Sequence, residues 1–299
     1  MNISTVIPAH FSNTFSTRFL VECLDSLEAQ TFAPHEVIIS DDSKGVQLDD
    51  FISSLINNYS FPIRVVRNAH QGGIGQNTNF GLKFAQGDIV HVLHQDDLVE
   101  DKHLYADVNL FFQDPATLWL LAGNSTHRLE RKSKISPSAF LGFNDIGGPS
   151  VCFFRNHLGI RFDEEYSMLV DVVFFEYLRR TYGEPVFLPG YRVSLRTGEH
   201  QHQHLITQEE FEKEQMKAIR AFKITNATLL DIRRNAIYPR LYRMTLNQLR
   251  ISGDISSVRF RIEILRSNIL NIAMPIYSIS PTGLQKIFSK LYGASVGKG

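Results

Sequence analysis

Short apolar runs alternate with segments of helical periodicity through the first two hundred residues, and no other feature limits the fold of this chain as strongly. Four runs have the length and β-branched content of buried strands; they span 3–8, 36–40, 63–67 and 88–93. Between them, apolar residues recur three or four positions apart, as in amphipathic helices, over 18–30, 48–58 and 74–85. Strands joined by helices of this length predict right-handed βαβ units and a parallel sheet buried on both faces, so we expect an α/β fold.

Polar side chains gather directly after three of the expected strands. The first, second and fourth strands end in Pro8-Ala9-His10, Asp41-Asp42 and His94-Gln95-Asp96-Asp97. The carboxyl ends of parallel strands meet at one edge of a sheet, where ligands of such folds bind. A turn or a helix N-cap explains a single Asp there, but four carboxylates repel one another unless a cation or a donor-rich ligand intervenes. We therefore expect a ligand site at this edge.

Six short motifs follow one another along the first hundred residues. They are V-I-P-A at 6–9, S-L-E-A-Q-T-F at 26–32, V-I-I-S-D-D-S at 37–43, G-G-I-G-Q-N-T-N-F-G-L at 72–82, A-Q-G-D-I-V at 85–90 and L-H-Q-D-D-L at 93–98. Their order and spacing resemble glycosyltransferase family 2, in its bacterial polysaccharide and cell-surface glycan members. The resemblance implies a GT-A domain over 1–205, Rossmann-like with a mostly parallel sheet flanked by helices, and leaves 206–299 as a basic C-terminal α-helical extension.

The resemblance also implies roles for the residues at the strand ends. In that family the acidic pair after the second strand holds the base and ribose of a sugar nucleotide, and a DxD-like motif after the fourth carries a metal on the diphosphate. By position, the nucleotide-binding residues would be Pro8, Ala9, Asp41, Asp42, Asn79 and Asp96, and the metal ligand would be Asp97. The expected cofactor is Mn²⁺ or Mg²⁺, because both combine one or two carboxylates with substrate phosphates.

Three positions depart from the family pattern. Gln95 stands where many members have an acid, and Thr78 stands where an Arg often precedes the Asn of this helix. Asn77 and Asn79 are therefore either polar contacts to the donor or helix-entry residues. Val170 replaces the acid that commonly precedes the catalytic one.

Further along, the chain resembles the acceptor side of the family. G-G-P-S-V-C-F-F at 147–154 is similar to the strand beneath the acceptor site, and Asp171 opens an apolar helix. An acid at this place in the family removes the proton of the attacking hydroxyl, so Asp171 is the expected general base; N-capping of the helix is the structural alternative. In the run 196–204, His200 or His202 would reach the diphosphate or metal, with solvated loop histidines or a separate zinc site as alternatives.

The formal charge of zero divides unevenly along the chain. Residues 1–216 hold 28 of the 31 acidic and 17 of the 31 basic residues, which leaves 3 and 14 for 217–299. In this basic part Ile, Val and Leu form a stripe with heptad spacing at 251, 255, 258, 262, 265, 269, 272 and 276. Such a stripe packs on the first domain, pairs with a second copy in a homodimer, or docks with the neighbouring arginines on an anionic membrane surface.

Other features exclude several classes of protein. A net charge of zero argues against a nucleic-acid partner, and no apolar run reaches the roughly 18 residues of a spanning helix. The N-terminus lacks a signal peptide pattern, and Cys23 and Cys152 show neither disulfide nor metal spacing. We expect a cytoplasmic protein, with at most a peripheral association with the inner face of the membrane.

Together these features predict an inverting glycosyltransferase that moves a sugar from a nucleoside-diphosphate sugar, such as a UDP-sugar, to a hydroxyl of a glycan or lipid-linked acceptor. A catalytically silent relative that binds sugar nucleotides, or serves as a scaffold, is the alternative from another class. A sugar-phosphate nucleotidyltransferase shares the fold but grips a triphosphate with a Gly-rich basic loop after the first strand. Residues 8–18 contain no glycine and one basic residue, which argues against it.

Overall fold

The computed structural model of the chain describes residues 1–11, 14–43, 51, 55–69, 72–124, 139–140, 144, 146–196, 207–223, 256–259, 261–262 and 265. Two compact units can be distinguished. The first comprises Met1–Ile135 and Asp145–Ile206, and the second comprises Ser136–Asn144 and Thr207–Gly299. The strand ends that carry the predicted site all lie in the first unit.

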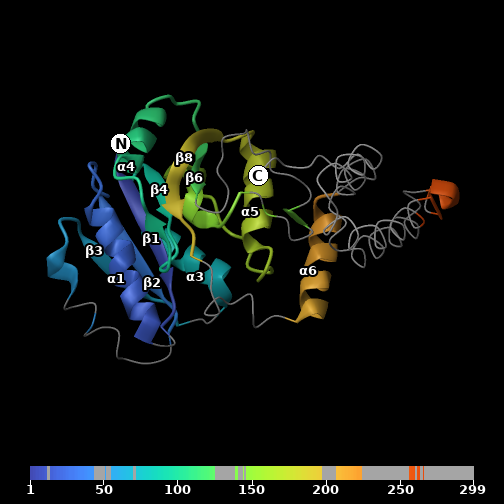
Figure 1. The fold of residues 1–299 in the computed structure, drawn as a ribbon, viewed down its shortest axis with the longest axis horizontal. Coiled ribbons are helices and arrows are strands. Elements are labelled where there is room, and N and C mark those ends of the chain that lie inside the picture. Colours follow the sequence, from blue (N-terminus) through green and yellow to red (C-terminus); the bar gives the residue numbers. More distant parts are fainter. Residues whose placement is uncertain are drawn as a thin grey trace, which may run out of the picture. The chain divides into compact units, whose positions relative to one another are not determined.

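The first unit is built on an eight-stranded sheet with the strand order β3-β2-β1-β4-β7-β6-β8-β5 (Figure 1). The strands are β1 (Ile3–Ala9), β2 (Glu36–Asp41), β3 (Ile63–Arg67), β4 (Ile89–Val92), β5 (Leu98–Val99), β6 (Trp119–Asn124), β7 (Cys152–Arg155) and β8 (Val186–Ser194). β1 pairs in parallel with both β2 and β4, and β2 pairs in parallel with β3. The four strands expected from the apolar runs are therefore present, and the predicted parallel arrangement is confirmed.

The other half of the sheet contains the antiparallel pairs. β7 runs antiparallel to β4 and to β6, and β5 runs antiparallel to β8, whereas β6 and β8 are parallel. A 3₁₀ turn, η3 (Pro149–Val151), leads directly into β7. Because β7 is antiparallel to β4, η3 lies where β4 ends.

Five α-helices are described: α1 (Thr14–Glu28), α3 (Gly73–Leu82), α4 (Leu104–Phe111), α5 (Val170–Tyr182) and α6 (Gln208–Ala221). The 3₁₀ turns η1 (Ile56–Asn58) and η4 (Asn156–Leu158) complete the described elements. Relative to the periodicity, α1 begins a turn earlier and α3 ends three residues sooner. The expected helix at 48–58 falls largely outside the described residues.

Side chains that alternate along β1 place helices on opposite faces of the sheet. A Cβ added to Gly81 of α3 would lie 2.7 Å from Val6 Cγ1, so the absence of a side chain permits this close approach. On the other face, Thr5 Oγ1 is 2.7 Å from the Tyr105 hydroxyl of α4. Both faces are thus covered, which agrees with the complete burial of β1 and β2.

In the second unit, α6 begins with a capping box in which Glu210 N donates to Thr207 Oγ1 and Thr207 N donates to the Glu210 carboxylate. The rings of Phe140 and Phe222 pack with their centroids 5.2 Å apart. Of the heptad stripe, Val258, Ile262 and Leu265 are described, and they are 71%, 45% and 61% exposed. No helix among the described residues is long and apolar enough to cross a membrane.

Candidate active site

The carboxyl ends of β1, β2 and β4 lie side by side because β1 is the parallel partner of both neighbours. Ala9 is in register with Asp41, and Asp42 N donates to Ala9 O over 3.2 Å. The buried Pro8 and Ala9 therefore end β1 next to the acidic pair of β2. The sheet brings together the ends that the sequence motifs mark.

The two acids after β2 have different surroundings. Asp41 is fully buried; its Oδ2 is 2.9 Å from Arg67 of β3, and its Oδ1 accepts a hydrogen bond from Ser43 N. Asp42 is 7% exposed, and its Oδ1 lies 2.8 Å from His10 Nδ1. Asp41 thus fixes the end of β2 by contacts with Arg67 and Ser43, whereas Asp42 lies beside the exposed imidazole of His10.

Asn77 and Asn79 of α3 hold separate parts of the chain together. Asn77 Nδ2 donates to Ser40 O and to Ala9 O, which ties the ends of β2 and β1. Asn79 Nδ2 donates to Phe162 O and Glu164 Oε1, while its Oδ1 accepts from Phe162 N. Both amides thus make hydrogen bonds within the protein, and the nucleotide contact expected of Asn79 stays a prediction.

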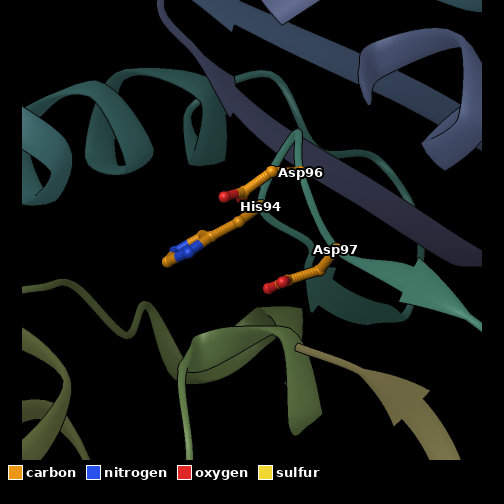
Figure 2. A group of neighbouring side chains, drawn as sticks. All are labelled: His94, Asp96 and Asp97. Atoms are coloured by element: carbon orange, nitrogen blue, oxygen red, sulfur yellow. The ribbon is translucent and has the colours of Figure 1, made fainter. Parts of the chain in front are cut away.

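The turn after β4 presents a potential metal site. Ligand atoms of His94, Asp96 and Asp97 all lie within 4.8 Å of one another, and Figure 2 shows the three side chains projecting to the same side of this turn. Asp97 N donates to His94 O over 3.1 Å, which closes the turn and sets the spacing of the three residues. The group is the donor set that a divalent cation uses in proteins, two carboxylates and an imidazole.

Gln95, the remaining residue of this turn, faces the end of β1 instead. Its Oε1 accepts from His10 N over 2.9 Å, and its Nε2 donates to His10 O over 3.0 Å. An acid at this position accepts hydrogen bonds but donates none, so it cannot replace both contacts. Gln95 therefore links the turn at residues 94–97, here called the metal-type turn, to the end of β1, which His10 follows.

Asp97 is held on both sides. Its Oδ2 accepts from Ser150 Oγ over 2.5 Å and its Oδ1 accepts from Arg196 N over 2.9 Å. Burial and the nearby charge of Asp96 raise the pKa of Asp97 to about 7, although these hydrogen bonds act in the opposite direction. A carboxylate so placed is stabilised in its charged form by a cation, so the residues fit the metal that the family resemblance implies.

A buried chain of hydrogen bonds through His91, Tyr105 and Thr5 holds the backbone of Ser150 in place. Burial lowers the pKa of His91 to about 4, so its imidazole is neutral at neutral pH. His91 Nε2 donates to Ser150 O over 2.8 Å, and its Nδ1 therefore accepts from the Tyr105 hydroxyl over 2.7 Å. Because the Tyr105 hydroxyl donates to His91, its oxygen accepts the hydrogen bond from Thr5 Oγ1. This chain fixes η3 against β4 and thus the serine that contacts Asp97.

Asp171 lies in the first turn of α5, where its Oδ1 accepts from Val172 N over 2.8 Å. The side chain is half-buried. The start of α5 packs on the start of α3, since a Cβ on Gly75 would lie 3.2 Å from Val170 Cγ2. Val170 thus has a packing role at the place where family members carry an acid.

His200 and His202 lie outside the described residues. The last described residue before them, Arg196, contacts Asp97 through its backbone and pairs with Glu22 of α1 through its guanidinium group. That group also lies 4.5 Å from the centre of the Phe19 ring. The segment with the two histidines therefore begins at a residue fixed beside the metal-type turn.

His94, His10 and Ser150 were not among the site residues expected from the sequence. His94 directly precedes the Asp pair in L-H-Q-D-D-L, which is the signal that could have identified it. Ser150 is more than fifty residues from Asp97 in the chain, and only the antiparallel pairing of β7 with β4 brings it there.

A sheet with this strand order, acidic groups after β2 and β4, and a cation-type cluster defines a glycosyltransferase of the GT-A type. The chain belongs to glycosyltransferase family 2, because the family described as "Glycosyl transferase family 2" matches residues 4–157, about half of its length. The expected family is thereby confirmed, and the sheet described above has the expected α/β architecture.

Curated relatives are similar over parts of their length. An uncharacterized glycosyltransferase of Haemophilus influenzae is 25% identical over 177 residues, 56% of this chain and 58% of the relative. Glycosyltransferase GlyG of Streptococcus pneumoniae is 26% identical over 99 residues, which are 33% of this chain and 31% of GlyG. The poly(ribitol-phosphate) beta-glucosyltransferase of Bacillus spizizenii is 30% identical over 106 residues, 35% of this chain and 16% of that enzyme. The matches thus span less than two thirds of each relative.

Solved structures share the fold. S. aureus TarS 1-349 in complex with UDP-GlcNAc superposes with a TM-score of 0.56 at 22% identity, over 83% of this chain and 72% of TarS 1-349. The mannosyltransferase PcManGT from Pyrobaculum calidifontis, in complex with GDP-Man and Mn²⁺, has a TM-score of 0.58 at 13% identity, over 91% of this chain and 80% of the other.

Proposed function

We propose that the chain transfers a sugar, with inversion, from a nucleoside-diphosphate sugar to a hydroxyl acceptor. The observation that carries this proposal is the proximity of His94, Asp96 and Asp97 to one another at the end of β4, two strands from the acids of β2. The acids of β2 could hydrogen-bond to the nucleoside of a sugar nucleotide, and a cation at the cluster after β4 could bind its charged diphosphate.

The nucleoside would lie against the ends of β1 and β2. Pro8 and Ala9 end β1 with apolar side chains, and Asp42 would accept hydrogen bonds from groups such as the N–H of a base. Asp41 pairs with Arg67 and accepts a hydrogen bond from Ser43 N, which fixes the backbone on both sides of Asp42. Asp96 would contact the donor nucleotide. The complexes of TarS with UDP and UDP-GlcNAc support a uridine donor.

Asp97, helped by Asp96, would hold a divalent cation, Mn²⁺ or Mg²⁺, on the diphosphate. The Mn²⁺ in the PcManGT complex supports this assignment. Bound there, the cation supplies positive charge that offsets the charge of the departing nucleoside diphosphate. Ser150 and Arg196 N orient the Asp97 carboxylate. His200 or His202, in the segment that begins next to Arg196, would contact the same diphosphate.

Asp171 would act as the general base. Its carboxylate accepts the proton of the acceptor hydroxyl while the oxygen forms a bond to the anomeric carbon, and the bond from that carbon to the diphosphate breaks with its electron pair on the diphosphate. A single displacement from the opposite face inverts the anomeric centre.

The acceptor would be a glycan or a lipid-linked saccharide, in a role in polysaccharide biosynthesis. The similarity to a poly(ribitol-phosphate) glucosyltransferase supports a polymeric acceptor. The basic part, 217–299, would mediate homodimer formation or association with the inner membrane surface, where lipid-linked acceptors are found. Its exposed Val258, Ile262 and Leu265 support a role in contacts.

Release of free nucleoside diphosphate from a panel of UDP- and GDP-sugars tests the proposal. The full chain is incubated with each donor, a mixture of polyol-phosphate and lipid-linked saccharide acceptors, and Mn²⁺, with EDTA as the control. We expect release from at least one donor and its loss in EDTA. Binding of donors without release from any of them would contradict the proposal and favour a silent relative.

A further inference from the structure

We propose that His94 is a nitrogen ligand of the cation, so that this site has a mixed imidazole and carboxylate character and prefers Mn²⁺ over Mg²⁺. The inference rests on the metal site of the proposed function and adds to it a ligand and a metal preference. It is carried by the position of the His94 imidazole beside Asp96 and Asp97.

The backbone of His94 is fixed, and this fixes where its ring can reach. His94 N donates to Ser150 Oγ over 2.9 Å. Its carbonyl oxygen accepts from Asp97 N and from the Cys23 thiol, the latter over 3.7 Å. The same serine donates to Asp97, so one hydroxyl sets the relative position of two of the three ligand-bearing residues.

The side chain, in contrast, has an unused nitrogen. His94 Nε2 is shielded from solvent and has no hydrogen-bond partner among the residues that the structure describes. Shielding a polar nitrogen without a partner costs free energy. Coordination of a cation at this cluster offsets that cost, because an imidazole nitrogen is a ligand of divalent metals.

The neighbouring residue cannot take the place of this ligand. Both polar groups of the Gln95 side chain are bonded to the backbone of His10. The potential ligand atoms that this turn brings within 4.8 Å of one another are those of His94, Asp96 and Asp97. Mg²⁺ is a hard cation that binds oxygen ligands and water, whereas an imidazole nitrogen is a ligand of transition metals. A histidine in the ligand set therefore favours Mn²⁺ or Co²⁺ over Mg²⁺.

Electron paramagnetic resonance of Mn²⁺ added to the full chain, first alone and then with UDP, tests this inference. The spectrum of unbound Mn²⁺ gives the dissociation constant, and the pulsed experiment detects a ¹⁴N nucleus bound to the metal. We expect ¹⁴N coupling in the wild type and in His35→Asn, a control at an exposed histidine outside the site. His94→Asn should lose the coupling and bind Mn²⁺ about tenfold more weakly or worse.

Two further variants separate the outcomes. His94→Asp should lose the ¹⁴N coupling, retain Mn²⁺ binding and show a smaller preference for Mn²⁺ over Mg²⁺, because all three ligands are then carboxylates. Mn²⁺ binding that Asp97→Asn abolishes but that shows no ¹⁴N coupling in the wild type, or coupling that persists in His94→Asn, overturns the inference and leaves the proposed function standing. Absence of Mn²⁺ binding by the wild type with UDP overturns both.

Discussion

Gln95 and His10 exchange two hydrogen bonds, from His10 N to Gln95 Oε1 and from Gln95 Nε2 to His10 O, at 2.9 and 3.0 Å. The contact joins the metal-type turn after β4 to the end of β1, and the His10 ring continues it to Asp42. A residue that departs from the family pattern thus connects the groups expected to hold the two halves of a sugar nucleotide.

The link between Gln95 and His10 should contribute to donor binding. Gln95→Glu keeps the acceptor but loses the donor and places a carboxylate against the His10 carbonyl. We expect the KM for the donor to rise about fivefold to tenfold, in line with the loss of a hydrogen bond of about 1 kcal/mol. Steady-state kinetics check this, with Gln113→Glu, at an exposed position after α4, as the matched control. An unchanged KM would show that the link is not needed.

Removal of the proposed base should separate chemistry from binding. Asp171→Asn keeps an oxygen for Val172 N but cannot take a proton, so turnover should fall by a factor of about 10² to 10⁴ while donor affinity stays unchanged. Donor titration by calorimetry and single-turnover rates measure the two quantities. Asp114→Asn, at an exposed position after α4, should behave as wild type. Wild-type turnover in Asp171→Asn would refute the assignment.

Asp97→Asn should abolish Mn²⁺ binding but raise the stability of the metal-free protein. Burial and Asp96 raise the pKa of Asp97 to about 7, so in the metal-free protein the ionised side chain destabilises the fold as pH rises from about 4 to 7, and fully above that. The variant should therefore have a higher Tm than the wild type in EDTA at pH 8, with the difference shrinking toward pH 4, and it should lose Mn²⁺ binding. A lower Tm for the variant at pH 8 would contradict this account.

Ser150 is expected to act on the metal through Asp97 and His94. Ser150→Ala removes the hydroxyl that donates to Asp97 Oδ2 and accepts from His94 N. Mn²⁺ affinity should fall about tenfold to a hundredfold, as for other residues that orient metal ligands. Ser150→Thr retains the hydroxyl and should recover most of the affinity. Equal Mn²⁺ affinity in wild type and Ser150→Ala would exclude this orienting role.

Stability at low pH should depend on Glu176. Burial alone would raise its pKa, but hydrogen bonds from Arg179 and Arg180 outweigh burial and lower it. A lowered folded-state pKa stabilises the protein above the unfolded-state pKa of about 4.5, and the effect disappears as pH falls through the folded-state pKa. Glu176→Gln should lose about 1–3 kcal/mol of unfolding free energy at pH 7 and less at pH 4, measured in urea. Glu184→Gln, at an exposed carboxylate, is the control with little effect.

Much of the parallel half of the fold could be predicted from the sequence. The apolar runs at β1, β2, β3 and β4 match the observed strands within two residues at each end, because strands buried on both faces leave a continuous apolar signal. The antiparallel half could not be predicted in this way. The pairing of β7 with β4 and β6 depends on contacts between residues more than thirty positions apart.

The division at the site is similar. The sequence by itself determined the acids at the strand ends, the family and the candidate base, since those follow from short motifs along the chain. Only the tertiary structure decided that Asn79 bonds to Phe162, that Gln95 bonds to His10, and that His94 lies beside Asp96 and Asp97 with its backbone bonded to Ser150. The physical reason is that hydrogen bonds and burial depend on which distant segments the sheet places side by side. A short sequence motif does not indicate these long-range contacts.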